Sequence, residues 1–279
     1  MPSQSQHKYE YEIDIKGDST GARIVRLIGK NMRVLELGAG PGSITKHLKN
    51  IGNCSVVAIE NDSKAIQKLS AYCEKIYNVD LNDVNWFRAL ENEEKFDVVL
   101  AADVLEHLYD PWAVLNAMNS LLKHNGSIIV SLPHIGHNAV IACILAGDFE
   151  YRDWGLLDRT HIRFFAMKNI QGLFDSAGLR INEAQFVVTR PELTEFANQW
   201  RKLPEQLRIA LSLNKYGMVY QVVIKTVPQN DLKNGIDLMS LTIDAQKTSG
   251  LDKIKSFFNS YLPNPLREIL RMLVHKLRK

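Results

Sequence analysis

Short apolar segments alternate with helical patterns along the first half of this chain, and this alternation restricts the folds open to it. The apolar segments lie at residues 33–37, 55–60, 75–79, 96–102 and 127–132. Between them, apolar residues recur at three- and four-residue steps, the spacing of a helix with one buried face. Strands that alternate with helices form βαβ units and a parallel sheet covered by helices on both faces. The sequence therefore predicts a doubly wound α/β fold.

The second half of the chain is less regular and suggests where the domain ends. Residues 133–167 are polar, aromatic and rich in histidine, and strands are expected at 179–189 and 218–225. We divide the chain into an N-terminal arm and helix (1–30), one α/β domain (31–227), and a polar linker with a tail (228–279).

Composition narrows the class of protein. The chain has 279 residues, 46% of them apolar, and a formal net charge of +3, too small to argue for a nucleic-acid partner. Its three cysteines are widely spaced, which excludes a disulfide scaffold and fits a reducing compartment. The N-terminus lacks the apolar segment of a secretory signal, and no apolar run approaches the roughly 20 residues of a membrane span. We expect a cytoplasmic protein that touches a membrane at most peripherally.

A glycine-rich loop joins the first strand to the following helix. The sequence EXGXGXG begins at Glu36, and Glu60 ends the next strand, 20 residues after Gly40. Glycines at this position let the backbone approach a ligand closely, in the crevice where open α/β sheets bind ligands. A carboxylate at the end of the second strand can accept hydrogen bonds from both hydroxyls of a ribose. A dinucleotide fingerprint would need glycine at 43, where Ser43 stands, and a phosphate-binding P-loop sequence is absent.

These blocks together resemble the class I S-adenosylmethionine-dependent methyltransferases over residues 30–225. The blocks are VLELGAGPG at 34–42, IE at 59–60, NVDL at 78–81, FDVVLAADVLEHL at 96–108 and LKHNGSIIV at 122–130. The resemblance implies a Rossmann-like seven-stranded sheet whose last strand is antiparallel, and S-adenosylmethionine as cofactor. It implies that Glu60 holds the ribose, Asp80 the adenine, and Asp103 lies near the methionine moiety. The full set of cofactor-binding residues that it predicts is Glu36, Gly38, Ala39, Gly40, Gly42, Glu60, Asn61, Asp80, Leu81 and Asp103.

Histidines gather where this fold places the methyl acceptor. A hydroxyl acceptor benefits from a base whose pKa lies near the working pH, and histidine is the usual one. The catalytic candidates are His161, His137 and His107, with Asp158 as a polar partner. Purely structural roles remain as alternatives to these catalytic roles. Asp158 and Arg163 could pair to hold a lid, and Glu106 with His107 could form a solvated helix face. Because no third ligand lies at useful spacing from the pair His134 and His137, we expect no metal.

The segments SLPHIGH at 131–137 and GLLDRTHIRFF at 155–165 resemble methyltransferases found with glycosyltransferases in surface-polysaccharide pathways. This chain departs from their pattern at His134, where asparagine is usual. The resemblance implies O-methylation of a sugar or glycan precursor. Two alternatives stay open: a quinone or another membrane-borne small molecule as acceptor, and a domain that binds the cofactor without catalysis and serves as an interaction module.

The end of the chain carries a basic amphipathic pattern. Asn264 and Pro265 are typical of a helix start, and apolar residues then recur on one face. Five basic residues and one acidic residue give residues 264–279 a formal charge of +4. Such a helix can lie on an anionic membrane surface or pack on a protein surface, so peripheral membrane contact through 264–279 is predicted; the oligomeric state is left open.

Overall fold

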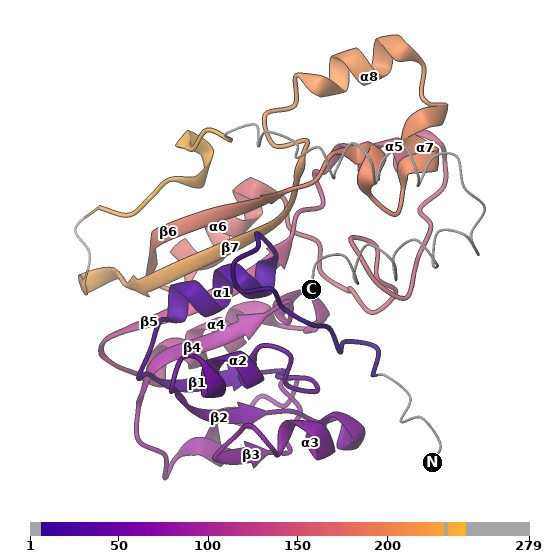
Figure 1. Ribbon diagram of the computed structural model, residues 1–279. Coiled ribbons are helices and arrows are strands. Elements are labelled where there is room, and N and C mark those ends of the chain that lie inside the picture. The colour runs from indigo at the N-terminus through magenta and orange to yellow at the C-terminus, as the bar shows by residue number, and fades with distance from the viewer. Residues whose placement is uncertain (1–6, 232–233, 244–279) are drawn as a thin grey trace, which may run out of the picture. The chain divides into compact units, whose positions relative to one another are not determined.

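The computed structural model describes residues 7–231 and 234–243 (Figure 1). They divide into two compact units. Unit 1 takes its described residues from 7–136, 151–187 and 219–241, and unit 2 mainly from 137–150 and 188–218. The tail predicted at 264–279 lies outside the described residues.

Unit 1 is built on a seven-stranded sheet with the strand order β3-β2-β1-β4-β5-β7-β6 (Figure 1). Strands β1 to β5 pair in parallel, and β7 pairs with β5 in the antiparallel sense. This confirms the predicted doubly wound, Rossmann-like sheet with an antiparallel last strand. The strands are β1 (Arg33–Leu37), β2 (Ser55–Ile59), β3 (Lys75–Tyr77), β4 (Phe96–Ala102), β5 (Leu122–Pro133), β6 (Leu179–Val188) and β7 (Val219–Pro228).

Three α-helices of unit 1 begin at residues whose side chains cap the helix N-terminus. Ser19 accepts a hydrogen bond from the backbone of Ala22 at the start of the first helix, and Asp62 and Asp110 cap two others in the same way. The α-helices are α1 (Thr20–Ile28), α2 (Thr45–Asn50), α3 (Ser63–Leu69), α4 (Pro111–Ser120) and α6 (Met167–Ser176). The 3₁₀ turns are η1 (Trp86–Leu90), η2 (Leu105–His107), η4 (Gln229–Asp231) and η5 (Leu238–Ser240).

The core of unit 1 lies between the sheet and its helices. On one face, α1 and α2 bury apolar residues such as Ile24 and Leu48 against alternate strand residues such as Val34 and Leu100. Helix α4 packs against strand β5 of the sheet and also contacts helix α6. Burial on both faces explains why the strands are continuous apolar runs.

Two findings revise the expected domain boundary of unit 1. Residues after 228 were expected to be a linker, but Leu238 of η5 is fully buried and its backbone N–H bonds to Gln171 of α6. The backbone N–H of Ile236 likewise donates to the carbonyl of Ile181 in β6. The folded unit therefore continues to Leu241. At its other end, Ile13 and α1 belong to the core rather than to a separate arm.

Unit 2 is a small helical unit. It contains α5 (Asn138–Leu145), η3 (Pro191–Leu193), α7 (Ala197–Lys202) and α8 (Glu205–Ser212). Ala142 of α5 packs with Trp200 and Leu203, and Leu211 of α8 borders this cluster. Among the described residues, no helix of either unit is long and apolar enough to cross a membrane.

Candidate active site

Unit 1 contains a cavity of about 640 Å³ at the carboxyl ends of its parallel strands. Each of the first five strands contributes residues to it: Gly38 follows β1, Glu60 follows β2, Asp80 lies beyond β3, Asp103 follows β4 and Pro133 ends β5. The crevice at the carboxyl ends of the strands is where open α/β sheets bind ligands, and the volume suits a small-molecule site.

The glycine loop forms one end of the cavity, and its three glycines, Gly38, Gly40 and Gly42, all have a conformation that other residues rarely adopt. Gly38 has φ of +58° and Gly40 has φ of +55°. A Cβ on Gly38 would lie 2.8 Å from Cγ2 of Val104, whereas a Cβ on Gly40 would meet nothing within 4 Å. Gly38 therefore permits close packing inside the protein, and Gly40 leaves space open at the cavity.

These two glycines give contrasting predictions. We expect Gly38→Ala to lower the free energy of unfolding by about 3 kcal/mol, because left-handed strain adds to the clash with Val104. Gly40→Ala should cost only about 1 kcal/mol of stability but should weaken cofactor binding, because its methyl group would enter the cavity. Urea unfolding and calorimetric titration with S-adenosylhomocysteine measure the two effects. A larger stability loss for Gly40→Ala than for Gly38→Ala would contradict this assignment.

Glu60 ties the glycine loop to the second strand. One carboxylate oxygen accepts the backbone N–H of Gly40 at 2.7 Å, and the other accepts those of Asn61 and Asp62, each at 2.8 Å. A carboxylate offers about four acceptor positions, so this one retains capacity for a ligand hydroxyl. Glu60 is 9% exposed and lines the cavity, as does Asn61.

Glu36 is almost fully buried at the wall of the cavity. It is 2% exposed, and its carboxylate accepts a hydrogen bond of 2.6 Å from the hydroxyl of Thr45 at the start of α2. Burial raises its pKa to about 7; the bond from Thr45 lowers the pKa, and the charge of Glu60 raises it further. The contacts of Glu36 thus join the glycine loop to α2.

The remaining predicted cofactor residues divide into two groups. Ala39, Asp80, Leu81 and Asp103 line the cavity with the residues named above. Gly42 is not among the lining residues; a Cβ there would approach Tyr72 at 3.1 Å and Leu69 at 3.2 Å, so it allows close packing against the end of α3.

Asp103 marks a sharp turn at the end of β4. Its backbone is left-handed, with φ of +54°, and its carboxylate accepts hydrogen bonds from Ser131 at 2.7 Å and Gln221 at 2.9 Å. These two bonds, from β5 and the antiparallel strand β7, fix the carboxylate at the cavity wall. The turn also leads the chain directly into η2.

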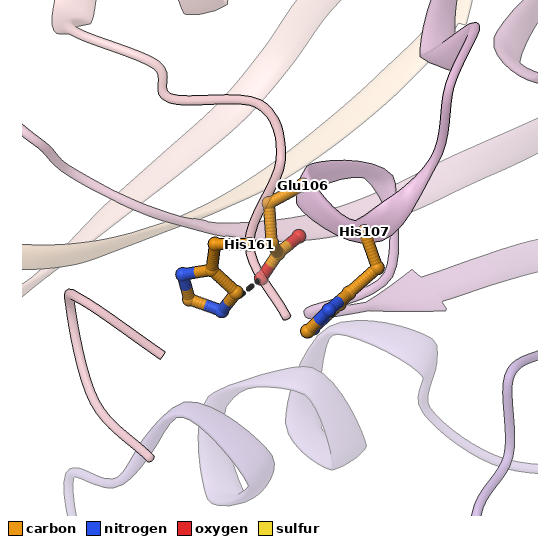
Figure 2. A group of neighbouring side chains, drawn as sticks. All are labelled: Glu106, His107 and His161. Carbon is orange, nitrogen blue, oxygen red and sulfur yellow. Dashed lines mark ion pairs between the residues drawn. The ribbon is translucent and has the colours of Figure 1, made fainter. Parts of the chain in front are cut away.

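The other end of the cavity holds a cluster of three buried or half-buried side chains that point toward one another, Glu106, His107 and His161 (Figure 2). Nε2 of His161 lies 3.9 Å from Oε1 of Glu106, and the two imidazole rings meet edge to face with centroids 4.7 Å apart. Burial, with a smaller effect from His107, lowers the pKa of His161 to about 4. Burial, reinforced by the charges of Asp103 and Asp158, raises the pKa of Glu106 well above its usual value.

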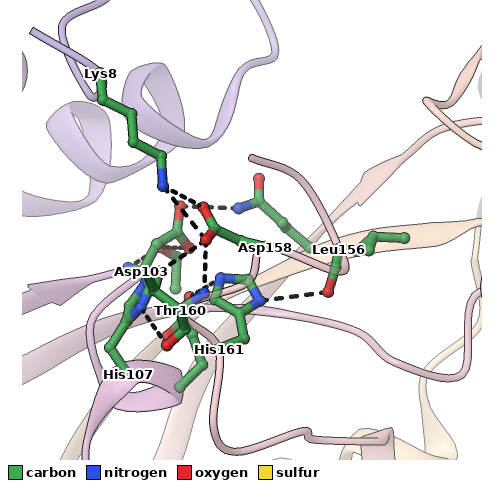
Figure 3. Close-up of polar contacts among 10 residues, drawn as sticks. Lys8, Asp103, His107, Leu156, Asp158, Thr160 and His161 are labelled. Carbon is green, nitrogen blue, oxygen red and sulfur yellow. Dashed lines mark hydrogen bonds and ion pairs between the residues drawn. The ribbon is translucent and has the colours of Figure 1, made fainter. Parts of the chain in front are cut away.

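The N-terminal arm closes over the loop that carries His161. Nζ of Lys8 lies 3.0 Å from Oδ2 of Asp158, and Oδ1 of Asp158 accepts hydrogen bonds from the backbone and the hydroxyl of Thr160 (Figure 3). Although burial raises the pKa of Asp158, the bonds from Thr160 and Lys8 lower it overall. Asp158 is therefore a charged clamp that orders the loop, and Lys8, Tyr9 and Tyr11 of the arm line the cavity.

The structure departs from the sequence analysis at three positions. His137 does not line the cavity: its Nδ1 accepts from the backbone of Ala139 as the cap of α5, and its Nε2 donates to the carbonyl of Thr189. Both ring nitrogens are therefore engaged inside unit 2. Arg163 donates to the carbonyl of Tyr109 instead of pairing with Asp158. Glu106, for which a solvated helix face was considered, is 0% exposed.

The cavity residues fit S-adenosylmethionine. Its sulfonium and ammonium groups are cationic, and Glu36, Glu60, Asp80 and Asp103 give this wall acidic side chains. Gly40 leaves space open at the cavity, and Glu60 has one acceptor position left for a ribose hydroxyl. The one charged lysine at the cavity, Lys8, is paired with Asp158 within the described structure.

Comparison with known proteins agrees with this fold. The methyltransferase domain family matches residues 6–184, which is more than half of the chain. The chain belongs to this family. It has the class I methyltransferase fold, which solved structures share with it.

Named relatives and solved structures lie at low identity. The chain is similar to the mitochondrial ubiquinone biosynthesis O-methyltransferase of Dictyostelium discoideum, with 24% identity over 66% of this chain and 61% of that protein. It thus spans less than two thirds of that relative. The ubiquinone biosynthesis O-methyltransferase of Rhodopseudomonas palustris strain BisB5 is also 24% identical, over 71% of this chain and 72% of the relative. A methyltransferase structure from Mesorhizobium loti has a TM-score of 0.52 at 13% identity, covering 76% of this chain and 99% of its own, and shares the fold.

Proposed function

We propose that this protein transfers a methyl group from S-adenosylmethionine to a phenolic hydroxyl of a quinone precursor. The observation that carries the proposal is that one cavity joins the glycine loop and Glu60 to the buried cluster of Glu106, His107 and His161. A methyl donor held at the first end would face an acceptor oxygen at the second. The names of the relatives, which are O-methyltransferases of ubiquinone biosynthesis, support the same acceptor class.

The lining at the acceptor end suits a flat aromatic ring. Several aromatic and apolar side chains line the same cavity as the cluster, and rings pack well against such surfaces. They are Tyr9, Tyr11, Leu108, Pro133, Trp154 and Tyr220. A membrane-borne precursor would also agree with the peripheral contact predicted for residues 264–279.

The polar residues that favoured a sugar acceptor in the sequence are occupied by contacts within the protein. Asp158 bonds to Lys8 and Thr160, Arg159 pairs with Asp153 at 2.9 Å, and Arg163 donates to a backbone carbonyl. Fewer of these groups remain to recognise a ring of hydroxyls. These contacts support a phenol over a glycan as the acceptor.

Methyl transfer from S-adenosylmethionine requires few reactive groups of the protein itself. S-adenosylmethionine supplies a methyl group bound to a sulfonium sulfur. The acceptor oxygen forms a bond to this methyl carbon while the C–S bond breaks, and the electron pair of that bond stays on sulfur. Nδ1 of His161 lies 3.3 Å from the carbonyl of Leu156, which can only accept, so Nε2 carries the lone pair. That nitrogen can accept the hydrogen bond of an acceptor hydroxyl. A phenol, with a pKa of about 10, gives up its proton far more readily than an alcohol. The arm held by Lys8 and Asp158 covers this end and limits access of water.

A methyl-transfer assay with labelled cofactor tests the proposal. Catechols and hydroxybenzoates with adjacent oxygens should gain one CH₂ unit in mass, and sugar nucleotides should not. His161→Ala should lower turnover about 100-fold while leaving affinity for S-adenosylhomocysteine unchanged. His124→Ala, at an exposed position of β5, is the matched control and should retain full activity. Methylation of sugars but not phenols would refute the acceptor class, and cofactor binding without turnover on any acceptor would favour the interaction module.

A further inference from the structure

The cluster at the acceptor end contains the ligand set of a metal site. Glu106, His107 and His161 each offer one ligand atom, and all of these atoms lie within 4.8 Å of one another. The contact between Nε2 of His161 and Oε1 of Glu106 is 3.9 Å. Ligand atoms around a tetrahedral zinc ion lie about 3.3 Å apart, given Zn–N distances of about 2.05 Å. Small side-chain rotations would therefore bring the three atoms around one ion.

The hydrogen bonds of both histidines have the pattern found behind metal ligands. Nδ1 of His107 lies 3.1 Å from the carbonyl of Thr160, and Nδ1 of His161 lies 3.3 Å from the carbonyl of Leu156 (Figure 3). Because a carbonyl only accepts, both Nδ1 atoms carry the proton and both Nε2 atoms keep a lone pair. Metal-binding histidines almost always donate their second ring nitrogen to a carbonyl or carboxylate in this way, which fixes the tautomer and the ring orientation.

Glu106 gives an independent indication of a missing partner. Its side chain is buried, it lines the cavity, and neither carboxylate oxygen has a hydrogen-bond partner on another described residue. Buried polar groups without a partner are rare in folded proteins, and each one calls for an explanation such as an ion. The backbone carbonyl of Glu106 accepts the N–H groups of Ile162 and Arg163, so the loop that carries His161 is docked directly on this turn.

We propose that Glu106, His107 and His161 bind one divalent transition-metal ion, and that this ion holds an acceptor with two adjacent oxygens. Two imidazoles and one carboxylate suit Zn²⁺, Co²⁺, Mn²⁺ or Fe²⁺ better than Mg²⁺ or Ca²⁺, which prefer oxygen ligands. Three protein ligands leave coordination positions open for the acceptor. The acceptor part of this inference rests on the proposed function, whereas metal binding itself can be measured without any acceptor.

The absence of a metal was predicted from a different pair of histidines, His134 and His137, which has no third ligand at useful spacing. His134 and His137 share a short spacing, but Nδ1 of His134 donates to the carbonyl of Val219, and both ring nitrogens of His137 are engaged in unit 2. His161 lies 54 residues after His107 in the chain, and only the docking of the loop on η2 brings them together.

A bound ion would change how the acceptor loses its proton. A phenol oxygen that coordinates a divalent ion has a lower pKa, so its proton can leave to water before methyl transfer. The oxygen then forms the O–C bond while the C–S electrons stay on sulfur. In this loaded state, Nε2 of His161 holds the ion instead of accepting the hydrogen bond of the hydroxyl.

Metal titration of the full chain, stripped with a chelator, tests the site. Zn²⁺ should bind with a stoichiometry of one by calorimetry, and Co²⁺ should give visible absorption bands typical of nitrogen and oxygen ligands. His161→Ala and Glu106→Gln should each weaken Zn²⁺ binding by roughly 100-fold or more. His124→Ala is again the control. Circular dichroism and affinity for S-adenosylhomocysteine verify that each variant is folded.

The outcomes separate the two proposals. Absence of a bound equivalent in the wild-type chain, or equal Zn²⁺ affinity in the wild-type chain and both ligand variants, would overturn the metal site. If phenols are methylated at full rate after chelation and no metal binds, the proposed function stands and the site does not. Stoichiometric metal binding that depends on His161 and Glu106, without methylation of any phenol, supports the site and refutes the acceptor class.

Discussion

Glu60→Gln is expected to weaken binding of S-adenosylhomocysteine by about 100-fold. A hydrogen bond to a charged group contributes about 1.5–3 kcal/mol, and one acceptor position of the carboxylate remains for the ribose. A loss of about 3 kcal/mol corresponds to this factor. The amide also presents a donor to the backbone N–H groups of Gly40, Asn61 and Asp62, which the carboxylate now accepts. Calorimetric titration measures the affinity.

The matched control is Glu94→Gln, which makes the same chemical change at an exposed position. Its affinity for S-adenosylhomocysteine should equal that of the wild-type chain. Retention of wild-type affinity by Glu60→Gln, in a folded protein, would show that Glu60 serves only to hold the glycine loop.

Glu36→Gln is expected to remove a pH-dependent loss of stability. Burial, together with the charge of Glu60, raises the pKa of Glu36 to about 7, from an ordinary value of 4.5. Between these values the folded chain binds more protons than the unfolded chain, so the free energy of unfolding falls as the pH rises. The effect of this one group is complete above pH 7 and amounts to about 3 kcal/mol. Glutamine stays neutral and can still accept the hydrogen bond of Thr45.

Urea unfolding between pH 4.5 and 8 measures this effect. Glu36→Gln should match the wild-type chain at the acid end and exceed its stability by up to about 3 kcal/mol at the upper end. Glu94→Gln should follow the wild-type curve throughout. If the curves of Glu36→Gln and the wild-type chain run parallel, Glu36 is not protonated in the folded state at low pH.

The sheet was predictable because its strands are buried on both faces. The expected strands at 33–37 and 96–102 coincide with β1 and β4. Less apolar segments were harder to place. β5 begins at Leu122 rather than at 127, because Leu122 pairs with Phe96 across a register shift. Helical spacing was expected between the segments at 75–79 and 96–102, but this part of the chain forms the 3₁₀ turn η1, in which Trp86 and Leu90 are buried, and Val84 before it is 83% exposed.

The two ends of the cavity differed in how far the sequence could predict them. The residues predicted to bind the cofactor follow directly after strands, so topology alone brings Gly38, Glu60 and Asp103 to one edge. The cluster at the acceptor end depends on the loop that carries His161. Two backbone hydrogen bonds dock this loop on Glu106, and no local periodicity reveals them. The one available signal for Glu106 was its place beside His107 directly after a strand end.

The placement of the N-terminal arm affects how such enzymes can diverge. Lys8, Tyr9 and Tyr11 line the cavity, but the apolar core of unit 1 includes no residue before Ile13. Tyr9 and Tyr11 are 42% and 48% exposed, so substitutions there remove little buried surface. Natural variation in this short segment can therefore alter which ligands the cavity accommodates without changing the apolar core of unit 1.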